Sequence, residues 1–465
     1  MTNTNIMNHK LKALAVAVFA VLGLQAQTSF TLDEAIAYGL QNAHEIKLDE
    51  LNISDADAQI KEYYALGIPQ INANVNFQHA LEIPTQVLPD FISPSVYNVL
   101  FDENLLPRRD LNFGGGIPAQ FGVKNTLDAG VELQTLILDG SYFVGLRAQK
   151  LYKELVRREH ETVQYDVKSK VTQAYMTCLN LRKNISLLNN NISSIDKIYS
   201  ETKAIYESGF AEKLDVDRLY LSKKNLETER DNLTRLFDVS TLALKFVMGF
   251  PISDDITLTS TFKELADGAM LANLESLPAL DLNNRTEVRS LNTAVELQDM
   301  NVKRLRYAYL PTLTGFINYG QTLQRNDLFD ENDNDWFPRS IVGVNLSIPI
   351  FDGFDKKAKI QRAKISRENT LLQKSLFERS IELDVNIHYL SYLNAKEKVR
   401  STKENLDLAE NIYEITKIKF REGVGSSLEV TQAETEWYRS QTNYSAAQFE
   451  LITTYNDLQT ALGNL

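Results

Sequence analysis

The feature that most constrains this chain is a pattern that occurs once in each half. Residues 204–216 read AIYESGFAEKLDV, and residues 419–430 read KFREGVGSSLEV. In each copy a glycine, Gly209 or Gly423, ends a long helical pattern, and a new helix begins within a few residues. These stretches predict two helical hairpin tips on one duplicated body.

Long stretches without glycine or proline surround both tips. Residues 146–208 form a stretch of 63 residues, and residues 354–422 form one of 69. At 1.5 Å per residue, the shorter of these would be a helix about 95 Å long, which no globular core can bury. A second unbroken stretch follows each tip, in residues 210–248 and 426–462. Such lengths predict a coiled-coil or barrel-like assembly of helices.

Other landmarks also recur with the same spacing. Asn42 lies 27 residues before Pro69, and Asn284 lies 27 residues before Pro311. Each half is predicted to contain a short helix, a strand, a loop, a strand, a long helix, a tip and a return helix. Residues 250–280 break this pattern and predict a short strand and a small helix. The sequence therefore predicts a tandem duplication with a longer loop in its first half.

The first residues resemble a secretory signal peptide. Lys10 and Lys12 precede an apolar stretch in residues 13–24, and Leu24-Gln25-Ala26 resembles a cleavage site. The mature chain is therefore expected to leave the cytosol. The predicted boundaries are a signal peptide at 1–26, a first repeat at 27–249, a connector at 250–280 and a second repeat at 281–465.

Strands are predicted where apolar and polar residues alternate. In residues 70–78 the apolar members share one face and the asparagines and glutamines share the other. Similar alternation occurs in residues 121–137, 313–319 and 342–348. The helix predicted over residues 31–66 begins with a capping box formed by Thr31 and Glu34. Long loops are predicted over residues 79–120 and 321–339.

Two assemblies suit strands with one apolar and one strongly polar face. In a soluble sandwich the apolar face meets another sheet, whereas in an outer-membrane barrel it faces lipid and the polar face lines a wet lumen. The strongly polar faces and the signal peptide favour the barrel. Four strands cannot close a membrane barrel, because known single-chain barrels have at least eight. The strands are therefore expected to close between chains, at a stoichiometry that the residue pattern leaves open.

Composition and motifs exclude several other functions. The net charge of −12 argues against nucleic-acid binding, which needs clustered lysine and arginine. The five histidines have no metal-ligand spacing, and no ATPase, zinc-hydrolase or serine-hydrolase motif occurs. We therefore expect no catalytic residue, cofactor or metal site, and no enzyme.

The run Asp330–Asp335 suggests either a calcium loop or a solvated acidic loop. Trp336 and Phe337 suit an aromatic girdle or ordinary packing.

In these motifs the chain resembles the TolC family of outer-membrane efflux proteins. The resemblance covers essentially the whole mature chain. It is carried by Thr31-Leu32-Asp33-Glu34-Ala35-Ile36 with Asn42, by the restart at Asn284-Arg285-Thr286-Glu287-Val288, by the two tips and by Ala461-Leu462-Gly463. Each motif is modest alone, but their order and doubled spacing are specific.

The resemblance implies a fold that is mainly α with a transmembrane β-barrel. A homotrimer would give a 12-stranded barrel in outer-membrane lipid and a helical barrel across the periplasm. The implied function is a passive conduit for efflux or type I secretion. Its implied partners are a periplasmic adaptor and, through it, an inner-membrane transporter that supplies the energy.

The resemblance also implies roles for residues at the tips. The family's adaptors dock there, which carries over to Tyr206, Gly209, Leu214, Val216, Phe420, Gly423, Leu428 and Val430. Acidic residues past the second tip commonly narrow the periplasmic entrance in this family. Glu429 occupies the first such position, with Asp215 as its counterpart, but Gln432 replaces the second acid. Alternatively, these acids stabilise helix N-termini through the helix dipole.

Two other classes of protein remain as alternatives. A periplasmic coiled-coil adaptor or scaffold would share the long hairpins but would lack the alternating strands and the pore. A secreted enzyme with a helical body would need a catalytic constellation, which the motifs do not provide. Electrophoresis without heating separates these classes, because a barrel trimer runs as an SDS-resistant species.

Overall fold

The computed structural model describes residues 28–112, 116–272, 276–327 and 335–464. The predicted signal peptide and most of the acidic run at 330–335 lie outside the described residues. The chain forms two compact units, one built from residues up to 57, 151–298 and 366 onwards, and one from residues 58–150 and 299–365. No helix among the described residues is both long and apolar enough to span a membrane.

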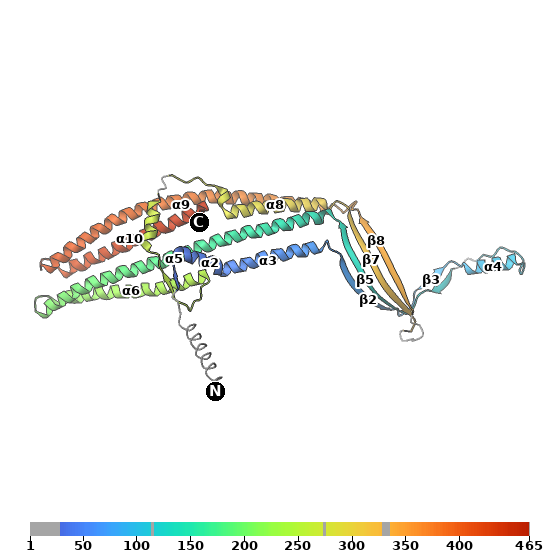
Figure 1. The fold of residues 1–465 in the computed structure, drawn as a ribbon, viewed down its shortest axis with the longest axis horizontal. Helices are drawn as coiled ribbons and strands as arrows, with labels where there is room; N and C mark the ends of the chain where they lie inside the picture. The colour runs from blue at the N-terminus through green and yellow to red at the C-terminus, as the bar shows by residue number, and fades with distance from the viewer. Residues whose placement is uncertain (1–27, 113–115, 273–275, 328–334, 465) are drawn as a thin grey trace, which may run out of the picture. The chain divides into compact units, whose positions relative to one another are not determined.

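The long helices of Figure 1 follow the predicted stretches. They are α5 (Gly140–Glu207) and α9 (Asp355–Arg421), and the return helices are α6 (Lys213–Met248) and α10 (Ser427–Leu462). Within the first unit, α5 and α6 form one antiparallel hairpin, and α9 and α10 form the other. The predicted N-terminal helix is interrupted at Ala43, giving α2 (Leu32–Asn42) and α3 (His44–Ala65), and α8 (Thr286–Tyr307) is its counterpart in the second half.

The start of α2 has the predicted cap. The Thr31 hydroxyl accepts a hydrogen bond from the Glu34 N–H, and the Glu34 carboxylate accepts one from the Thr31 N–H at 2.8 Å. The predicted connector also forms a short strand, β6 (Ile256–Leu258), and a helix, α7 (Phe262–Leu271). Strand β6 pairs in parallel with β1 (Thr28–Phe30).

The core of the first unit lies where the connector meets the helices. The Tyr175 hydroxyl donates to the Phe30 carbonyl at 2.8 Å, and Tyr392 donates to the Ala269 carbonyl at 3.0 Å. Arg182 donates to the Leu258 carbonyl at 2.6 Å. These bonds satisfy backbone groups of β1 and of the connector that burial removes from water. Cys178 is fully buried in the same core.

The two recurring asparagines, Asn42 and Asn284, lie where the return helices end. Gly249 ends α6 with a φ of +69°, and a Cβ there would lie 2.3 Å from the Asn42 carbonyl oxygen. Gly463 ends α10 with a φ of +76°, and a Cβ there would lie 3.2 Å from the Asn284 backbone. Glycine is required at both ends because only a residue without a Cβ fits this conformation and this close approach. Arg285 also donates to the last carbonyls of α10.

The second unit contains an antiparallel sheet in the order β2–β5–β7–β8 (Figure 1). Its strands are β2 (Gln70–His79), β5 (Asn125–Leu138), β7 (Thr312–Arg325) and β8 (Trp336–Ser347). Among the described residues, β2 and β8 each pair with a single strand, so each leaves one edge of the sheet open.

Both predicted loops need correction. Residues 79–120 contain an antiparallel pair, β3 (Thr85–Leu88) and β4 (Ile117–Gln120), and a helix, α4 (Ile92–Asp102). The loop predicted at 321–339 is shorter, because β7 continues to Arg325 and β8 begins at Trp336. The ladder pairs Leu323 with Trp336, which extends both strands beyond their alternating parts.

Candidate functional site

The sheet separates side chains into the two faces that the sequence predicts. Apolar residues of the edge strands are strongly exposed: Val75 is 74% exposed and Val342 is 78% exposed. The polar residues of β2 lie on the opposite face, because consecutive strand residues alternate in direction. An exposed apolar sheet face is unusual for a soluble protein and marks a surface that meets another apolar phase.

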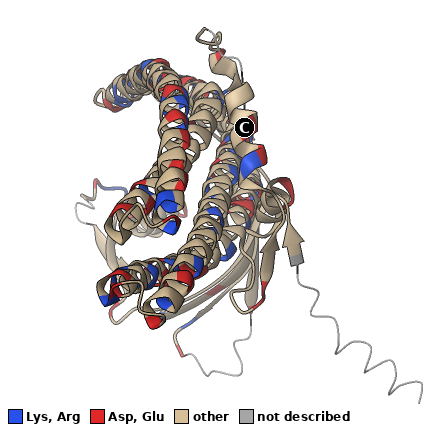
Figure 2. Cartoon of the chain, turned by 90° about the vertical axis from the view of Figure 1, so that its left-hand side faces the viewer, with Lys and Arg blue, Asp and Glu red and all other residues tan. Residues whose placement is uncertain are grey.

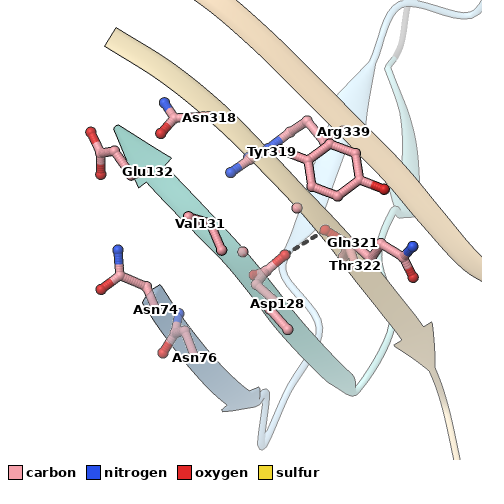
Figure 3. Close-up of a pocket in the computed structure, with 13 residues that line it drawn as sticks. Asn74, Asn76, Asp128, Val131, Glu132, Asn318, Tyr319, Gln321, Thr322 and Arg339 are labelled. Carbon is pink, nitrogen blue, oxygen red and sulfur yellow. Dashed lines mark hydrogen bonds between the residues drawn. The ribbon is translucent and has the colours of Figure 1, made fainter. Parts of the chain in front are cut away.

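A hollow of about 290 Å³ lies on the polar face (Figure 3). The register places Gly130 of β5 directly opposite Gly320 of β7, with Asn74 of β2 and Arg339 of β8 on either side. A Cβ on either glycine would lie 3.0 Å from a carbonyl oxygen of the other strand. The two missing side chains therefore create the hollow.

Polar side chains occupy the next positions along the strands. Asp128 and Glu132 lie on β5 on either side of Gly130, and Figure 3 shows them at the two ends of the hollow. The Thr322 hydroxyl donates to Asp128 Oδ1 at 2.5 Å, which fixes that carboxylate against β7. The polar face thus presents two carboxylates, amides and one guanidinium.

Valine at Gly130 or Gly320 is expected to lower the free energy of unfolding by about 1–3 kcal/mol, because the added atoms press on the backbone of the paired strand. Valine at Thr126, which is already β-branched and shares the polar face of β5, is the matched control and is expected to be neutral. Thermal unfolding of the purified protein measures both. Equal stability of all three variants would show that the hollow tolerates side chains.

The structure places the predicted tip residues at two turns of the same kind. Gly209 has a φ of +85° and Gly423 has a φ of +75°. The N–H groups of Phe210 and Val424 each donate back to a carbonyl five residues earlier, at 3.0 Å in both turns. This is a Schellman motif, which satisfies carbonyls that the helix end leaves free. Both glycines therefore end their helices, as the sequence predicts, and both adopt the left-handed conformation.

The other tip residues divide into exposed and buried groups. Leu214 is 51% exposed and Leu428 is 44% exposed, and Tyr206 is also exposed. In contrast, Val216 and Val430 are buried, and Phe420 packs against the apolar cluster that contains Val430. The buried valines therefore position the tips, and the exposed leucines and tyrosine form their surface. Figure 2 shows acidic and basic residues interspersed along the helices of the hairpins.

The two acidic candidates have different surroundings. Asp215 of α6 accepts a hydrogen bond from the Ser427 hydroxyl of α10, so it joins the two hairpins. Glu429 is exposed in the first turn of α10, and its N–H donates to the N-cap hydroxyl of Ser426 at 3.3 Å. The Glu429 side chain is therefore open to solvent, whereas the Asp215 carboxylate is hydrogen-bonded to Ser427. Gln432, where the family often has a second acid, is also exposed.

Sequence reasoning missed a buried polar group near the tips. Glu434 of α10 is 3% exposed and accepts a hydrogen bond from the Ser222 hydroxyl of α6 at 2.7 Å. The ring of Trp437 stacks on Tyr413 of α9, with centroids 4.8 Å apart. The sequence carries no signal for this burial, because Glu434 lies among several exposed acids of the same helix.

Comparisons with known proteins agree with this architecture. The model of the outer membrane efflux protein family matches residues 277–464. The outer membrane protein TolC of Vibrio cholerae is 23% identical over 375 residues, which cover 78% of this chain and 83% of that protein. The probable efflux pump outer membrane protein TtgC of Pseudomonas putida is 20% identical over 318 residues, which cover 67% of this chain and 63% of that protein.

The fold is also similar to that of solved channels. The Campylobacter jejuni CmeC outer membrane channel superimposes with a TM-score of 0.69 at 16% identity, covering 93% of this chain and 85% of that channel. The family model matches the second half of the sequence, whereas the structural similarity extends over both halves. The family match, the sequence relatives and the shared fold agree: residues 277–464 of this chain match the outer membrane efflux protein family, and the chain shares the fold of the solved outer membrane channels.

Proposed function

We propose that this chain is the outer-membrane channel of a tripartite efflux or type I secretion system. Three copies would contribute four strands each to a 12-stranded barrel in the outer membrane, and their helices would form a tunnel through the periplasm. The channel is passive, and its energy comes from an inner-membrane transporter coupled through a periplasmic adaptor. The two halves, with long helices of 68 and 67 residues and return helices of 36 each, support a tandem duplication.

The observation that carries this proposal is the four-stranded sheet with one exposed apolar face, one polar face and two open edges. In lipid, each unsatisfied backbone group at an open edge costs several kcal/mol. Pairing β8 of one copy with β2 of the next removes both edges at once. The apolar face then meets lipid, and the polar face with its hollow lines the lumen.

The alternative of a periplasmic adaptor or scaffold is less favoured, because such a protein has no use for an exposed apolar sheet face. The names of the relatives also describe outer membrane proteins, and that of TtgC describes a probable efflux pump outer membrane protein. The test is electrophoresis of the membrane fraction with and without heating. A slow, SDS-resistant trimer that dissociates on heating supports the channel, and a soluble protein that migrates as a monomer in both lanes contradicts it.

The hairpin tips are the proposed docking sites for the adaptor. The exposed residues Tyr206, Leu214 and Leu428 offer apolar contacts beside Gly209 and Gly423. A partner with its own helical hairpin suits this surface, because exposed apolar residues at helix ends pack well against other helices. Val216, Val430 and Phe420 support the site from the buried side.

The exposed carboxylates of Glu429, one from each copy of the chain, are proposed to form an acidic ring at the periplasmic entrance. Three copies of Glu429 around a narrow opening would raise the local concentration of cations, because low-dielectric walls focus the field. Asp215 contributes by holding α6 to α10 through Ser427.

Alanine at Glu429 is expected to reduce the cation preference of single channels in planar bilayers and to change their conductance. Alanine at Glu422, which is exposed on the other side of the tip, is the control and should leave both unchanged. If Glu429 acts only on the helix dipole, the variant loses about 0.3–1 kcal/mol of stability and its conductance equals that of the wild type. That result would contradict the proposed role of Glu429 at the periplasmic entrance.

A further inference from the structure

A buried polar cluster joins the two helical hairpins of the first unit. Its centre is Glu434 of α10, whose Oε2 accepts the hydrogen bond from Ser222 of α6. Its other carboxyl oxygen, Oε1, is buried without a hydrogen-bond partner, and so is Nε1 of Trp437 one helical turn away. A buried carboxylate with one unsatisfied oxygen is costly unless the group is neutral.

The groups packed around Glu434 do not compensate a negative charge. Ser222 contributes one hydroxyl, and Tyr413 of α9 directs its own hydroxyl to Ser194 of α5 at 3.1 Å. Among the described residues, no lysine or arginine forms an ion pair with Glu434. Three basic residues of the surrounding helices pair with other acids: Lys417 pairs with Glu414, Lys223 pairs with Asp196, and Arg421 pairs with Glu201.

The position of Glu434 connects its protonation to hairpin packing. Its hydrogen bond crosses from α10 to α6, and the cluster around it contains residues of all four hairpin helices. We propose that Glu434 is a protonation-dependent link between the two hairpins: its neutral form allows them to pack, and its ionised form loosens the junction near the tips. The proposal concerns packing within one chain and holds whether or not the chain is a channel.

The electrostatic environment supports this link. Burial raises the pKa of Glu434 from 4.5 to about 7, against the opposing effect of the Ser222 hydrogen bond. The packed junction therefore holds a proton that a solvent-exposed carboxyl would release. The contribution of the neutral Glu434 carboxyl to the stability of the junction is fully present below about pH 4.5. This contribution is lost progressively as the pH rises through 7. A pKa shift of this size changes the equilibrium between the packed and the loosened junction on the order of a hundredfold.

Hydrogen–deuterium exchange of the full-length protein in detergent tests the link. The readout is exchange of peptides that cover residues 219–226 and 430–440, in the wild type and in Glu434→Gln, compared at the same pH. Glutamine has the shape of the neutral acid and cannot ionise. The two proteins are expected to exchange alike at pH 5, whereas at pH 8.5 the wild type exchanges at least about threefold faster.

Two further variants separate protonation from simple packing. Glu436→Gln removes an exposed acid two residues away and is expected to behave as the wild type at every pH. Ser222→Ala removes the hydrogen bond that stabilises the carboxylate, so the midpoint of the pH-dependent exchange should move to higher pH. Equal exchange of wild type and Glu434→Gln at pH 8.5, or an unmoved midpoint in Ser222→Ala, would overturn the proposal.

Discussion

Arginine in place of Val75 is expected to prevent assembly in the outer membrane, whereas arginine in place of the next residue, Asn76, is not. Val75 lies in the middle of β2, is 74% exposed and belongs to the apolar face. A charged side chain on the lipid face near the bilayer midplane costs about 2–4 kcal/mol. Three copies in a trimer multiply this cost, so the expected loss of assembled protein is nearly complete.

Position 76 is a matched control, because it is adjacent to position 75 in the same strand and its side chain lies on the opposite, polar face of the sheet. It pairs with Asp128 on the polar face, where an arginine gains a nearby carboxylate. The measurement is the amount of SDS-resistant, heat-modifiable protein in the outer-membrane fraction. The Asn76 variant should assemble normally and change only conductance. If Val75→Arg assembles as well as Asn76→Arg does, the apolar face does not meet lipid.

Valine in place of both Gly209 and Gly423 is expected to abolish export while leaving assembly intact. Both glycines have positive φ, where a side chain costs roughly 1–2 kcal/mol, and β-branched valine is among the least tolerated. Apart from the adjacent residues of the chain, no heavy atom of the described residues lies within 4 Å of the Cβ position at either glycine, so the effect comes from the backbone and not from a clash. The strain should change the shape of the tips, which lie far along the chain from the sheet.

The measurement is export of a pump substrate in cells, alongside the amount of SDS-resistant trimer. Gly268→Val provides the control, because Gly268 has equally open space around its Cβ position but lacks a positive φ. It should export as the wild type does. Normal export by the double tip variant would mean that the tips do not couple to an adaptor, and loss of the trimer would mean that their strain reaches the barrel.

The sequence predicts the helical hairpins well because their signals are local. A glycine at Gly209 or Gly423 ends an unbroken helical stretch, and its positive φ follows from the lack of a Cβ. The start of α5 is less predictable, since the helix begins at Gly140 and contains Gly145. A Cβ at Gly145 would lie 1.8 Å from the Tyr63 hydroxyl, so this glycine serves packing between elements, which no local pattern reveals.

The sequence fails where structure depends on pairing or on context. Helix α4 and the β3–β4 pair lie in a segment rich in proline, asparagine and glycine, and none of their residues follows a sustained period. The hollow in the sheet becomes apparent only once the register sets Gly130 opposite Gly320. Burial of Glu434 likewise requires both hairpins, because α10 alone presents it as one acid among several.

Native mass spectrometry of the protein, extracted from membranes in mild detergent, measures how many copies of this chain close one barrel. We predict a single closed oligomer, because each copy has one open edge at β2 and one at β8, and we predict three chains in it because the resemblance to the TolC family implies a trimer. A species of one chain that keeps its sheet would contradict it, since four strands leave both edges exposed in lipid.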